Sequence, residues 1–425
     1  MKNCTHKFDL TAGDSRFRFF GNVNVVDGTN PISHTVSLPL SSVFKNYSHV
    51  LFATGCTLPI LHGALPPSKY CVPAISIVHW YTQHPLAACT PPPPLDRVSH
   101  ISIIGNGNVS LDVARILLMD VGVLSKYDVP KMVLDVLSRS TVKHVSIIGR
   151  RGPLEAAFTM KELREMINLP EASMIPLETS LVTPPSDSPP LTRQQTRVLQ
   201  LLQRGSRNLP GSQPKTWSLE FFRSPIGLTP PDSTSSPVQL SLAHTSVEPT
   251  TRRAVPTGEV STISTDLIIT SLGFQAEPND FYDPALHHMR NIAGRITDPE
   301  GRILKNVYSS GWASTGAKGV LASTLMDAYS VADMIIADWK TSGGPVDQLD
   351  DFSSPSVDPA IDGIPREVQE GLQEGLVTQY DDWKRIDAEE RKRGEELGKE
   401  RERMDWAGAQ RFMSYRSFTP DAIAS

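Results

Sequence analysis

The residues best suited to chemistry lie in one glycine-rich turn at residues 105–110, GNGNVS. Gly105 permits a sharp turn, Gly107 removes the Cβ that would block a pyrophosphate, and small Ser110 lets a helix and a strand approach closely. The free N–H groups and positive end of a following helix would face the phosphates. Taken alone, the pattern is equally typical of an ordinary strand-to-helix turn in an α/β protein.

Two arginines favour the nucleotide interpretation. Residues 142–149 form a β-type run that is followed directly by Arg150 and Arg151. In a doubly wound sheet this strand end lies beside the adenosine ribose, where NAD sites carry an acid and NADP sites carry arginine for the 2′-phosphate. The position holds no acid, so the sequence predicts NADP. The long spacing from the glycine turn predicts an insertion within residues 120–136.

The elements that must position these residues are indicated by hydrophobic periodicity. An apolar run before the glycine turn predicts a buried strand, and the residues after it show helical spacing. A proline run, TPPPP, predicts a linker just upstream. Further strands are expected within residues 17–26, 50–55, 219–222, 238–242 and 267–272, and helices at residues 156–167, at 191–204 and in the second half of residues 307–337. The charged stretch within residues 343–425 is interpreted as a solvated helix or tail.

Composition limits the class of protein. A chain of 425 residues can hold two or more domains. A net charge of −5 with mixed signs argues against a general nucleic-acid or membrane-surface binder. The four cysteines form no C-x-x-C pair, which suggests neither a metal site nor a disulfide scaffold and fits a reducing compartment. We see no bilayer-spanning run and no targeting segment, so the protein is expected to be cytosolic or its beginning to be absent.

At these motifs the chain resembles the adrenodoxin reductase family, the mitochondrial-type ferredoxin–NADP reductases. The resemblance runs from FRFFGNVNV at Phe17 through GNGNVSLDVARILL and IIGRRGPLEAAFTMKELREMINLP to FFRSP at Phe221. It continues in RAVPTGE at Arg253, in the SGW turn at Gly311 and in DWKRIDAEE near Asp382. Matches of this length are much more specific than a single glycine pattern.

The resemblance implies an α/β fold of two interleaved Rossmann-like nucleotide-binding domains. The expected divisions are residues 1–95 and 275–342 for the FAD domain, 96–274 for the NADP domain and 343–425 for a C-terminal extension. It also implies an enzyme that passes a hydride from NADPH to FAD, and then single electrons to a small acidic iron–sulfur protein of the ferredoxin or adrenodoxin type. A mitochondrial location, with at most peripheral membrane association, follows from the same resemblance.

Individual roles are implied in the same way. The NADP contacts are Asn106, Gly107, Asn108, Val109, Arg150, Arg151 and Glu162, and Gly319 lies beside both cofactors. The FAD contacts are Val23 or Val25, Trp312, Val320 and Leu321. Asp112 matches an acid at the nicotinamide end, and stabilisation of the helix N-terminus is an equally good account of it. Arg193 and Arg197 match the basic helix that receives the acidic ferredoxin.

Two departures from the family pattern affect these expectations. Family members begin with their own strand and G-x-G-x-x-G for FAD, which this chain does not show. We therefore expect an FAD domain that is incomplete at its N-terminus and binds FAD weakly or not at all. The strand within residues 50–55 should then present an unpaired edge. Ser314 and Thr315 stand where the family has basic residues.

Two other functions stay open. One is a non-catalytic NADP-binding protein that has lost FAD. The other is an electron-input subunit related to the glutamate synthase small subunit, which is disfavoured because no cysteine cluster is present.

Overall fold

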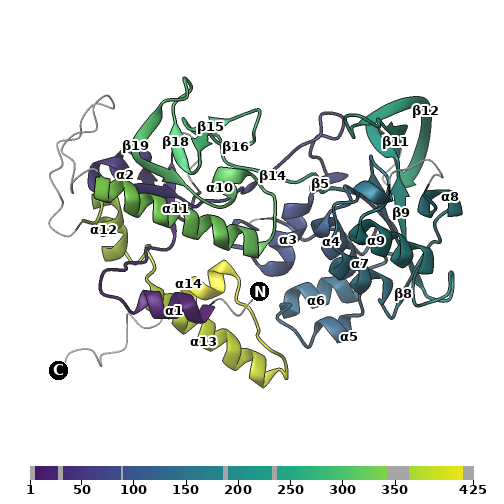
Figure 1. The fold of residues 1–425 in the computed structure, drawn as a ribbon. Coiled ribbons are helices and arrows are strands. Elements are labelled where there is room, and N and C mark those ends of the chain that lie inside the picture. Colours follow the sequence, from purple (N-terminus) through teal and green to yellow (C-terminus); the bar gives the residue numbers. More distant parts are fainter. Residues whose placement is uncertain are drawn as a thin grey trace. The chain divides into compact units, whose positions relative to one another are not determined.

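The chain folds into two compact units. The computed structural model describes residues 5–26, 32–87, 90–184, 190–231, 237–341 and 363–414 (Figure 1). The first unit comprises Met1–Leu58 and Gly273–Asp387, and the second comprises Pro59–Leu272 and Ala388–Ser425. Packing thus places residues 59–95 with the second unit, whereas the sequence assigned them to the FAD domain. The predicted domain boundaries were drawn by the cofactor that each domain binds, whereas the two units are defined by packing. The predicted boundaries therefore stay a prediction.

The second unit is built on a six-stranded sheet in which every pairing is parallel. Its strand order is β5-β13-β6-β7-β9-β8. The strands are β5 (Cys71–Pro73), β6 (His100–Ile104), β7 (His144–Gly149), β8 (Ala172–Met174), β9 (Lys215–Phe221) and β13 (Leu267–Thr270). Both faces of a parallel sheet are normally covered, so its central strands are largely buried and rich in apolar residues. The fully buried Ile101, Ile103 and Ile147 follow this rule.

Helices and an antiparallel ribbon complete this unit. The helices are α3 (Ala74–Thr82), α4 (Asn108–Leu118), α5 (Val121–Leu124), α6 (Lys131–Ser138), α7 (Met160–Ile167), α8 (Thr179–Val182), α9 (Arg193–Arg204) and α14 (Trp406–Ser414). The ribbon, at the upper right of Figure 1, contains β10 (Arg223–Thr229), β11 (Val238–Val247) and β12 (Ala254–Thr265). Helices α5 and α6 lie between α4 and β7, where the sequence predicted an insertion. Helix α7 starts four residues later than predicted, because Thr159 caps it and accepts a hydrogen bond from the Glu162 N–H.

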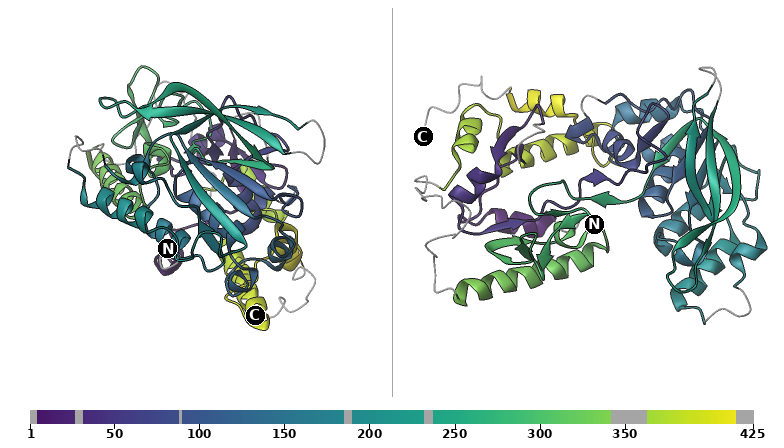
Figure 2. Two further views of the ribbon diagram at one scale, coloured as in Figure 1. Left: turned by 90° about the vertical axis from the view of Figure 1, so that its right-hand side faces the viewer. Right: turned by 90° about the horizontal axis from the view of Figure 1, so that it is seen from above.

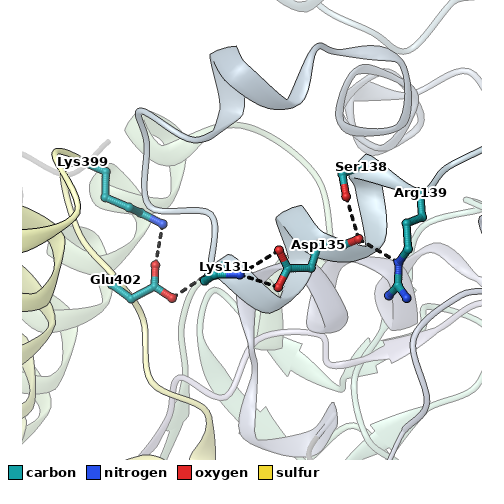
Figure 3. A network of polar contacts seen from close by, with 6 residues as sticks. All are labelled: Lys131, Asp135, Ser138, Arg139, Lys399 and Glu402. Carbon is teal, nitrogen blue, oxygen red and sulfur yellow. Dashed lines mark hydrogen bonds and ion pairs between the residues drawn. The ribbon is translucent and has the colours of Figure 1, made fainter.

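The charged C-terminal stretch is packed rather than simply solvated, which corrects the sequence interpretation. It forms α13 (Tyr380–Glu396), in which the Glu390 carboxylate is buried and accepts a 3.0 Å hydrogen bond from the Met404 N–H. Beyond the helix, the Lys399 side chain is only 4% exposed and its Nζ lies 2.6 Å from Glu402 Oε2. The other Glu402 oxygen accepts from the Lys131 N–H in the first turn of α6, a helix that lacks a side-chain cap of its own (Figure 3).

The first unit contains a four-stranded sheet of order β17-β18-β19-β3, in which β19 and β3 pair in parallel. Its elements are α1 (Thr5–Ala12), β1 (Val23–Val26), β2 (Val36–Pro39), α2 (Leu40–Asn46), β3 (Val50–Phe52), β15 (Tyr282–Asp283), β16 (His288–Met289), β17 (Asn291–Ile292), β18 (Arg295–Thr297), β19 (Ile303–Ser309), α10 (Trp312–Thr315), α11 (Leu321–Thr341) and α12 (Arg366–Gln373). Strands β1 and β2 form a separate parallel pair. Helix α11, the long green helix of Figure 2, packs on β19. As expected, β3 lies at the edge of its sheet.

Candidate functional site

The glycine turn of the second unit has the geometry of a phosphate cradle. Gly105 adopts φ +121°, and a Cβ there would collide with the Ser271 carbonyl. Gly107 is the N-cap of α4, and a Cβ on it would meet no atom within 4 Å. Open space therefore lies directly in front of the first turn of α4, where backbone N–H groups lack partners within the helix.

Asn106 has a side chain whose hydrogen-bonding capacity is unused. Its Nδ2 is buried and has no hydrogen-bond partner among the described residues. A buried amide without a partner costs free energy, so such a group in a native structure calls for a ligand or a water molecule. Asn108 is different, because its Oδ1 accepts a 2.7 Å hydrogen bond from the Thr159 N–H and so joins α4 to the start of α7. Val109, the neighbouring predicted contact, packs against the core.

The predicted 2′-phosphate pair lies at the end of β7. Arg150 is exposed and Arg151 is half-buried, and neither guanidinium has a partner among the described residues. Their backbone is fixed, since the Arg150 carbonyl accepts from Thr245 Oγ1 at 2.7 Å and the Arg151 carbonyl accepts from the Phe222 N–H at 3.4 Å. Two unpaired cations on a fixed backbone suit a phosphate dianion.

A cluster of carboxylates surrounds one arginine on α4. Arg115 Nη2 lies 2.7 Å from Asp112 Oδ1, its Nη1 lies 3.6 Å from Glu162 Oε2, and it also pairs with Glu165. Burial raises the pKa of Asp112 to about 6, with Glu162 adding to the rise and Arg115 opposing it. The structure thus brings together Asp112 and Glu162, two residues that the sequence assigned separately.

Sequence reasoning missed Arg115 as the centre of this cluster. Its three-residue spacing from Asp112 was a visible signal, because residues three apart are neighbours on a helix. Its contacts with Glu162 and Glu165 depend on the packing of α4 against α7, which spacing does not reveal. Tyr81 of α3 was also missed as a neighbour: its pKa rises to about 12 because it is buried, and the Asp112 charge adds to the rise.

The predicted FAD contacts lie in the first unit. Val23 and Val25 line a cavity of about 460 Å³ together with Thr54, Gly55 and other residues. Half-buried Trp312 begins α10, and its indole N–H donates to the Lys318 carbonyl at 3.1 Å. Gly319, Val320 and Leu321 form the exposed turn that leads into α11. The cavity and the Trp312 turn offer surfaces for parts of a dinucleotide, although Val23 and Val25 are the only predicted contacts that line the cavity itself.

Ser314 and Thr315, which differ from the family pattern, lie in an ordered turn. Ser314 Oγ donates to Asn291 Oδ1 at 3.0 Å, and Thr315 Oγ1 donates to the Gly311 carbonyl at 3.1 Å. Both hydroxyls therefore hold α10 in place within the unit.

The predicted partner helix is α9. A capping box of Thr192 and Gln195 starts it, and Val198, Leu199 and Leu202 face the core. Arg193 and Arg197 are exposed and have no acidic partner among the described residues. Arg193 is the first residue of the helix, where the macrodipole disfavours positive charge, so helix stability does not account for a cation at this position.

No group of histidine, cysteine and carboxylate side chains in the described residues could hold a metal ion. None of their helices is both long enough and apolar enough to cross a bilayer. Cys4 and Cys89 lie outside the described residues, and Cys56 and Cys71 are buried free thiols.

Comparison with known proteins identifies the family. No protein-family model matches the chain. The human mitochondrial NADPH:adrenodoxin oxidoreductase is 32% identical over 422 residues, which cover 95% of this chain and 80% of the relative. The NADPH-ferredoxin reductase FprA of Mycobacterium tuberculosis is 30% identical over 411 residues, covering 94% of this chain and 84% of the relative. The structure of that FprA in complex with NADPH superposes with a TM-score of 0.79 at 26% identity, over 97% of this chain and 87% of the other.

Fold and site together define an oxidoreductase with two nucleotide-binding units. The glycine turn and the arginine pair follow strands β6 and β7 of the parallel sheet, at the carboxyl ends of these strands, where doubly wound folds bind dinucleotides. The chain belongs to the adrenodoxin reductase family, as the sequence resemblance implied. The cofactors of this family are NADP and FAD. The unpartnered Asn106 amide, the open space beside Gly107 and the two free arginines fit the first of these cofactors.

Proposed function

We propose that this chain binds NADPH at the α4 turn and passes its electrons through FAD to an acidic iron–sulfur protein of the ferredoxin or adrenodoxin type. The observation that carries the proposal is the combination of an unpartnered buried amide at Asn106 with two unpaired arginines one strand away. The unpartnered amide costs free energy, and the two arginines have no anionic partner, until a ligand with a pyrophosphate and a further phosphate is bound.

Different residues of the second unit bind different parts of NADPH. The N–H groups at the start of α4, with Asn106, hold the pyrophosphate, and Gly107 leaves room for it. Arg150 and Arg151 bind the 2′-phosphate. Asp112 and Glu162, held together through Arg115, form a carboxylate cluster at the nicotinamide end. Arg115 keeps this cluster from carrying two uncompensated negative charges.

The residues of the first unit contact the flavin. When bound, FAD accepts a hydride from NADPH and releases its electrons singly. Val23 or Val25 contacts its adenine part, while Trp312, Gly319, Val320 and Leu321 contact the rest. Arg193 and Arg197 of the second unit attract the acidic partner and orient it. Relatives from human and fission yeast are named as mitochondrial, and we assign this chain to the same compartment.

The arginine pair provides the test of this proposal. Replacing Arg150 and Arg151 with Ala should remove most of the preference for NADPH over NADH, because each charge-assisted contact contributes about 1.5–3 kcal/mol. The dissociation constants of both cofactors are measured by titration, and a variant with the exposed Arg97→Ala change serves as the control. Equal affinity of the unmodified chain for the two cofactors would contradict the proposal.

A further inference from the structure

Four aromatic side chains of the first unit surround a small cavity. A space of about 180 Å³ is lined by Phe8 of α1, by Phe19 of the segment before β1, and by Tyr380 and Trp383 at the start of α13. We call these four side chains the aromatic cage. Its segments are far apart in the sequence, but α1 lies beside the start of α13 (Figure 1). None of the four residues is among those assigned to NADP, to FAD or to the acidic partner.

The rings of the aromatic cage stand at several angles to one another. The rings of Phe8 and Tyr380 are 5.4 Å apart at 58°, and those of Phe19 and Tyr380 are 6.2 Å apart at 74°. The Trp383 ring lies more nearly parallel to that of Tyr380, at 5.4 Å and 22°. Phe8 is also held by an edge contact with Phe17 at 5.5 Å. Aromatic surfaces therefore border the cavity from several directions.

The backbone fixes this arrangement. Gly21 and Thr378 form an antiparallel bridge, in which their N–H and C=O groups make hydrogen bonds of 2.8 and 3.1 Å. The bridge lies two residues from Phe19 and two from Tyr380, so it joins the segments that carry them. Gly21 allows this approach, because a Cβ there would collide with Thr378 and come within 3.0 Å of the Phe19 ring. The walls of the cage are thus set before any ligand arrives, which lowers the cost of binding.

Packing of the unit does not require the open space. Protein interiors contain few voids larger than a water molecule, whereas this cavity has room for several. Two of its walls also reach the solvent, since Phe8 and Trp383 are 43 and 40% exposed. A rigid group of aromatic rings around a space that solvent can enter suits a ligand better than it suits a core.

The chemistry of the aromatic cage favours a cation. The faces of aromatic rings attract positive charge within about 6 Å of the ring centroid. Lys384 shows this attraction, because its Nζ lies 5.4 Å from the Tyr380 centroid, although Lys384 does not line the cavity. The Tyr380 hydroxyl donates a hydrogen bond to the Asp9 carboxylate, and this bond raises the pKa of Tyr380 to about 12. Tyr380 therefore stays neutral, and Asp9 adds a negative charge at the edge of the cage.

The cation that fits this cage carries no N–H groups. A primary ammonium ion needs hydrogen-bond acceptors when it leaves water. The four side chains contain two polar groups: the Tyr380 hydroxyl, which is engaged with Asp9, and the Trp383 indole N–H, which can only donate. A quaternary ammonium ion has methyl groups in place of N–H groups, so it loses no hydrogen bonds between the rings.

We propose that the aromatic cage binds the quaternary ammonium group of a free small molecule of the choline class. The methyl groups occupy the space between the rings, and Asp9 supplies the opposite charge. A choline headgroup of a phospholipid carries the same cation with a phosphate beside it. Asp381 and Asp382 in the first turn of α13, together with Asp9, disfavour that phosphate by like-charge repulsion. The proposal does not depend on the binding of NADPH or FAD.

Binding is tested with the full chain and choline chloride. Titration calorimetry at constant ionic strength gives the affinity, and the NMR signal of the choline methyl protons should move upfield, because aromatic faces shield them. The control ligand is the neutral isostere of choline, in which a tert-butyl group replaces the trimethylammonium group. The isostere has the same shape without the charge, so it should bind at least about fivefold more weakly.

Two variants locate the site. Trp383→Leu keeps an apolar wall but removes the ring, and it should weaken choline binding about fivefold or more. Its control is Trp339→Leu, the same change at an exposed tryptophan of α11. Asp9→Asn should weaken the binding of choline about two- to fivefold and leave that of the isostere unchanged. Its control is Asp333→Asn, at an exposed carboxylate of α11.

Several results would overturn the proposal. Choline that fails to bind, or that binds no more tightly than the isostere, would show that the aromatic cage is not a cation site. Equal effects of Trp383→Leu and Trp339→Leu would place the binding elsewhere. Sedimentation of the chain with phosphatidylcholine vesicles, without binding of choline itself, would indicate a membrane contact in place of a small-molecule site.

Discussion

The side-chain amide of Asn106 lies against Gly149, so closely that a Cβ on residue 149 would come within 2.6 Å of Asn106 Nδ2. The first residue belongs to the glycine turn before α4, and the second ends β7, which is followed directly by Arg150 and Arg151. The two halves of the proposed NADP site are therefore in direct contact. Because Asn106 Nδ2 has no hydrogen-bond partner among the described residues, this contact fixes the position of the amide but leaves its N–H groups for a ligand.

Two glycine substitutions should have different consequences at this contact. Gly107→Ala adds a Cβ that meets no protein atom within 4 Å, so the free energy of unfolding should change by no more than about 1 kcal/mol. The same Cβ occupies the space of the pyrophosphate, and NADPH affinity should fall at least about tenfold. Gly149→Ala should lower both NADPH affinity and stability, the latter by about 1–3 kcal/mol, because it displaces Asn106. Urea unfolding and NADPH titration of both variants check this, and a Gly107→Ala variant with unchanged affinity would contradict it.

Strand β6, helix α4 and the glycine turn between them follow closely from local sequence signals. An apolar run, a glycine turn and a helical period predicted β6 and α4, because hydrophobic periodicity and glycine geometry act over a few residues. The long spacing before Arg150 predicted an insertion, and α5 and α6 are found there. The edge position of β3 was also expected.

Long-range packing accounts for what the sequence did not show. The charged C-terminal stretch has the composition of a solvated helix, yet Glu390 and Lys399 are buried. Glu390 accepts a hydrogen bond from the Met404 N–H beyond the helix, and Lys399 Nζ donates to the Val129 carbonyl. The sequence places Arg115 three residues after Asp112, but only the packing of α4 on α7 brings Glu162 and Glu165 to it. Such contacts depend on tertiary geometry, and no local pattern encodes them.

Asp112 should make stability depend on pH. Burial raises its pKa in the folded state to about 6, so the folded chain binds this proton more tightly than the unfolded chain does. The contribution of Asp112 is therefore fully present below about pH 4 and is lost as the pH rises through about 6. Asp112→Asn should become more stable relative to the unmodified chain by about 1 kcal/mol between pH 4.5 and pH 7.5, a value reduced for its partial exposure.

Urea unfolding at the two pH values checks this prediction. Asp135→Asn is the matched control, because Asp135 is an exposed carboxylate of the same unit, paired with Lys131 at 2.7 Å (Figure 3). A pH-independent difference between Asp112→Asn and the unmodified chain would show that Asp112 has an ordinary pKa.

Arg193 and Arg197 should determine how fast the acidic partner associates and should contribute little to folding stability. Replacing both with Glu should slow association with an acidic ferredoxin at low salt, and the difference should shrink as salt rises. Stability should stay constant or rise by about 0.3–1 kcal/mol, because an acidic residue at position 193 suits the N-terminus of the helix. Reductase rates over a range of salt concentrations measure this effect. A variant with Lys69→Glu and Arg97→Glu carries the same charge change elsewhere in the unit, and an equal loss in both variants would mean that only net charge matters.

A pair of part-buried histidines lies on neighbouring strands of the parallel sheet. His100 and His144 have ring centroids 4.9 Å apart, and Nε2 of each lies within hydrogen-bond distance of Ser146 Oγ, at 2.8 and 3.1 Å. His144 Nδ1 lies 2.8 Å from Thr216 Oγ1. Burial lowers the pKa of His144 to about 4, with His100 adding to the effect, and burial also lowers the pKa of His100. Both rings are therefore neutral at pH 7.

This pair should weaken the fold in mild acid. A histidine with a lowered pKa binds its proton more readily in the unfolded chain, so its contribution is fully present above about pH 6.5 and is lost as the pH falls toward 4. His144→Asn keeps a polar group beside Thr216 but cannot titrate. Between pH 7.5 and pH 5.0 the unmodified chain should lose about 1–2 kcal/mol more stability than this variant, measured by urea unfolding. Carboxylates that titrate in the same range affect both proteins equally, so only the difference reports His144. An equal loss of stability in the two proteins would contradict this prediction. It would mean that His144 is protonated inside the folded sheet at no cost in free energy, in spite of its packing against His100.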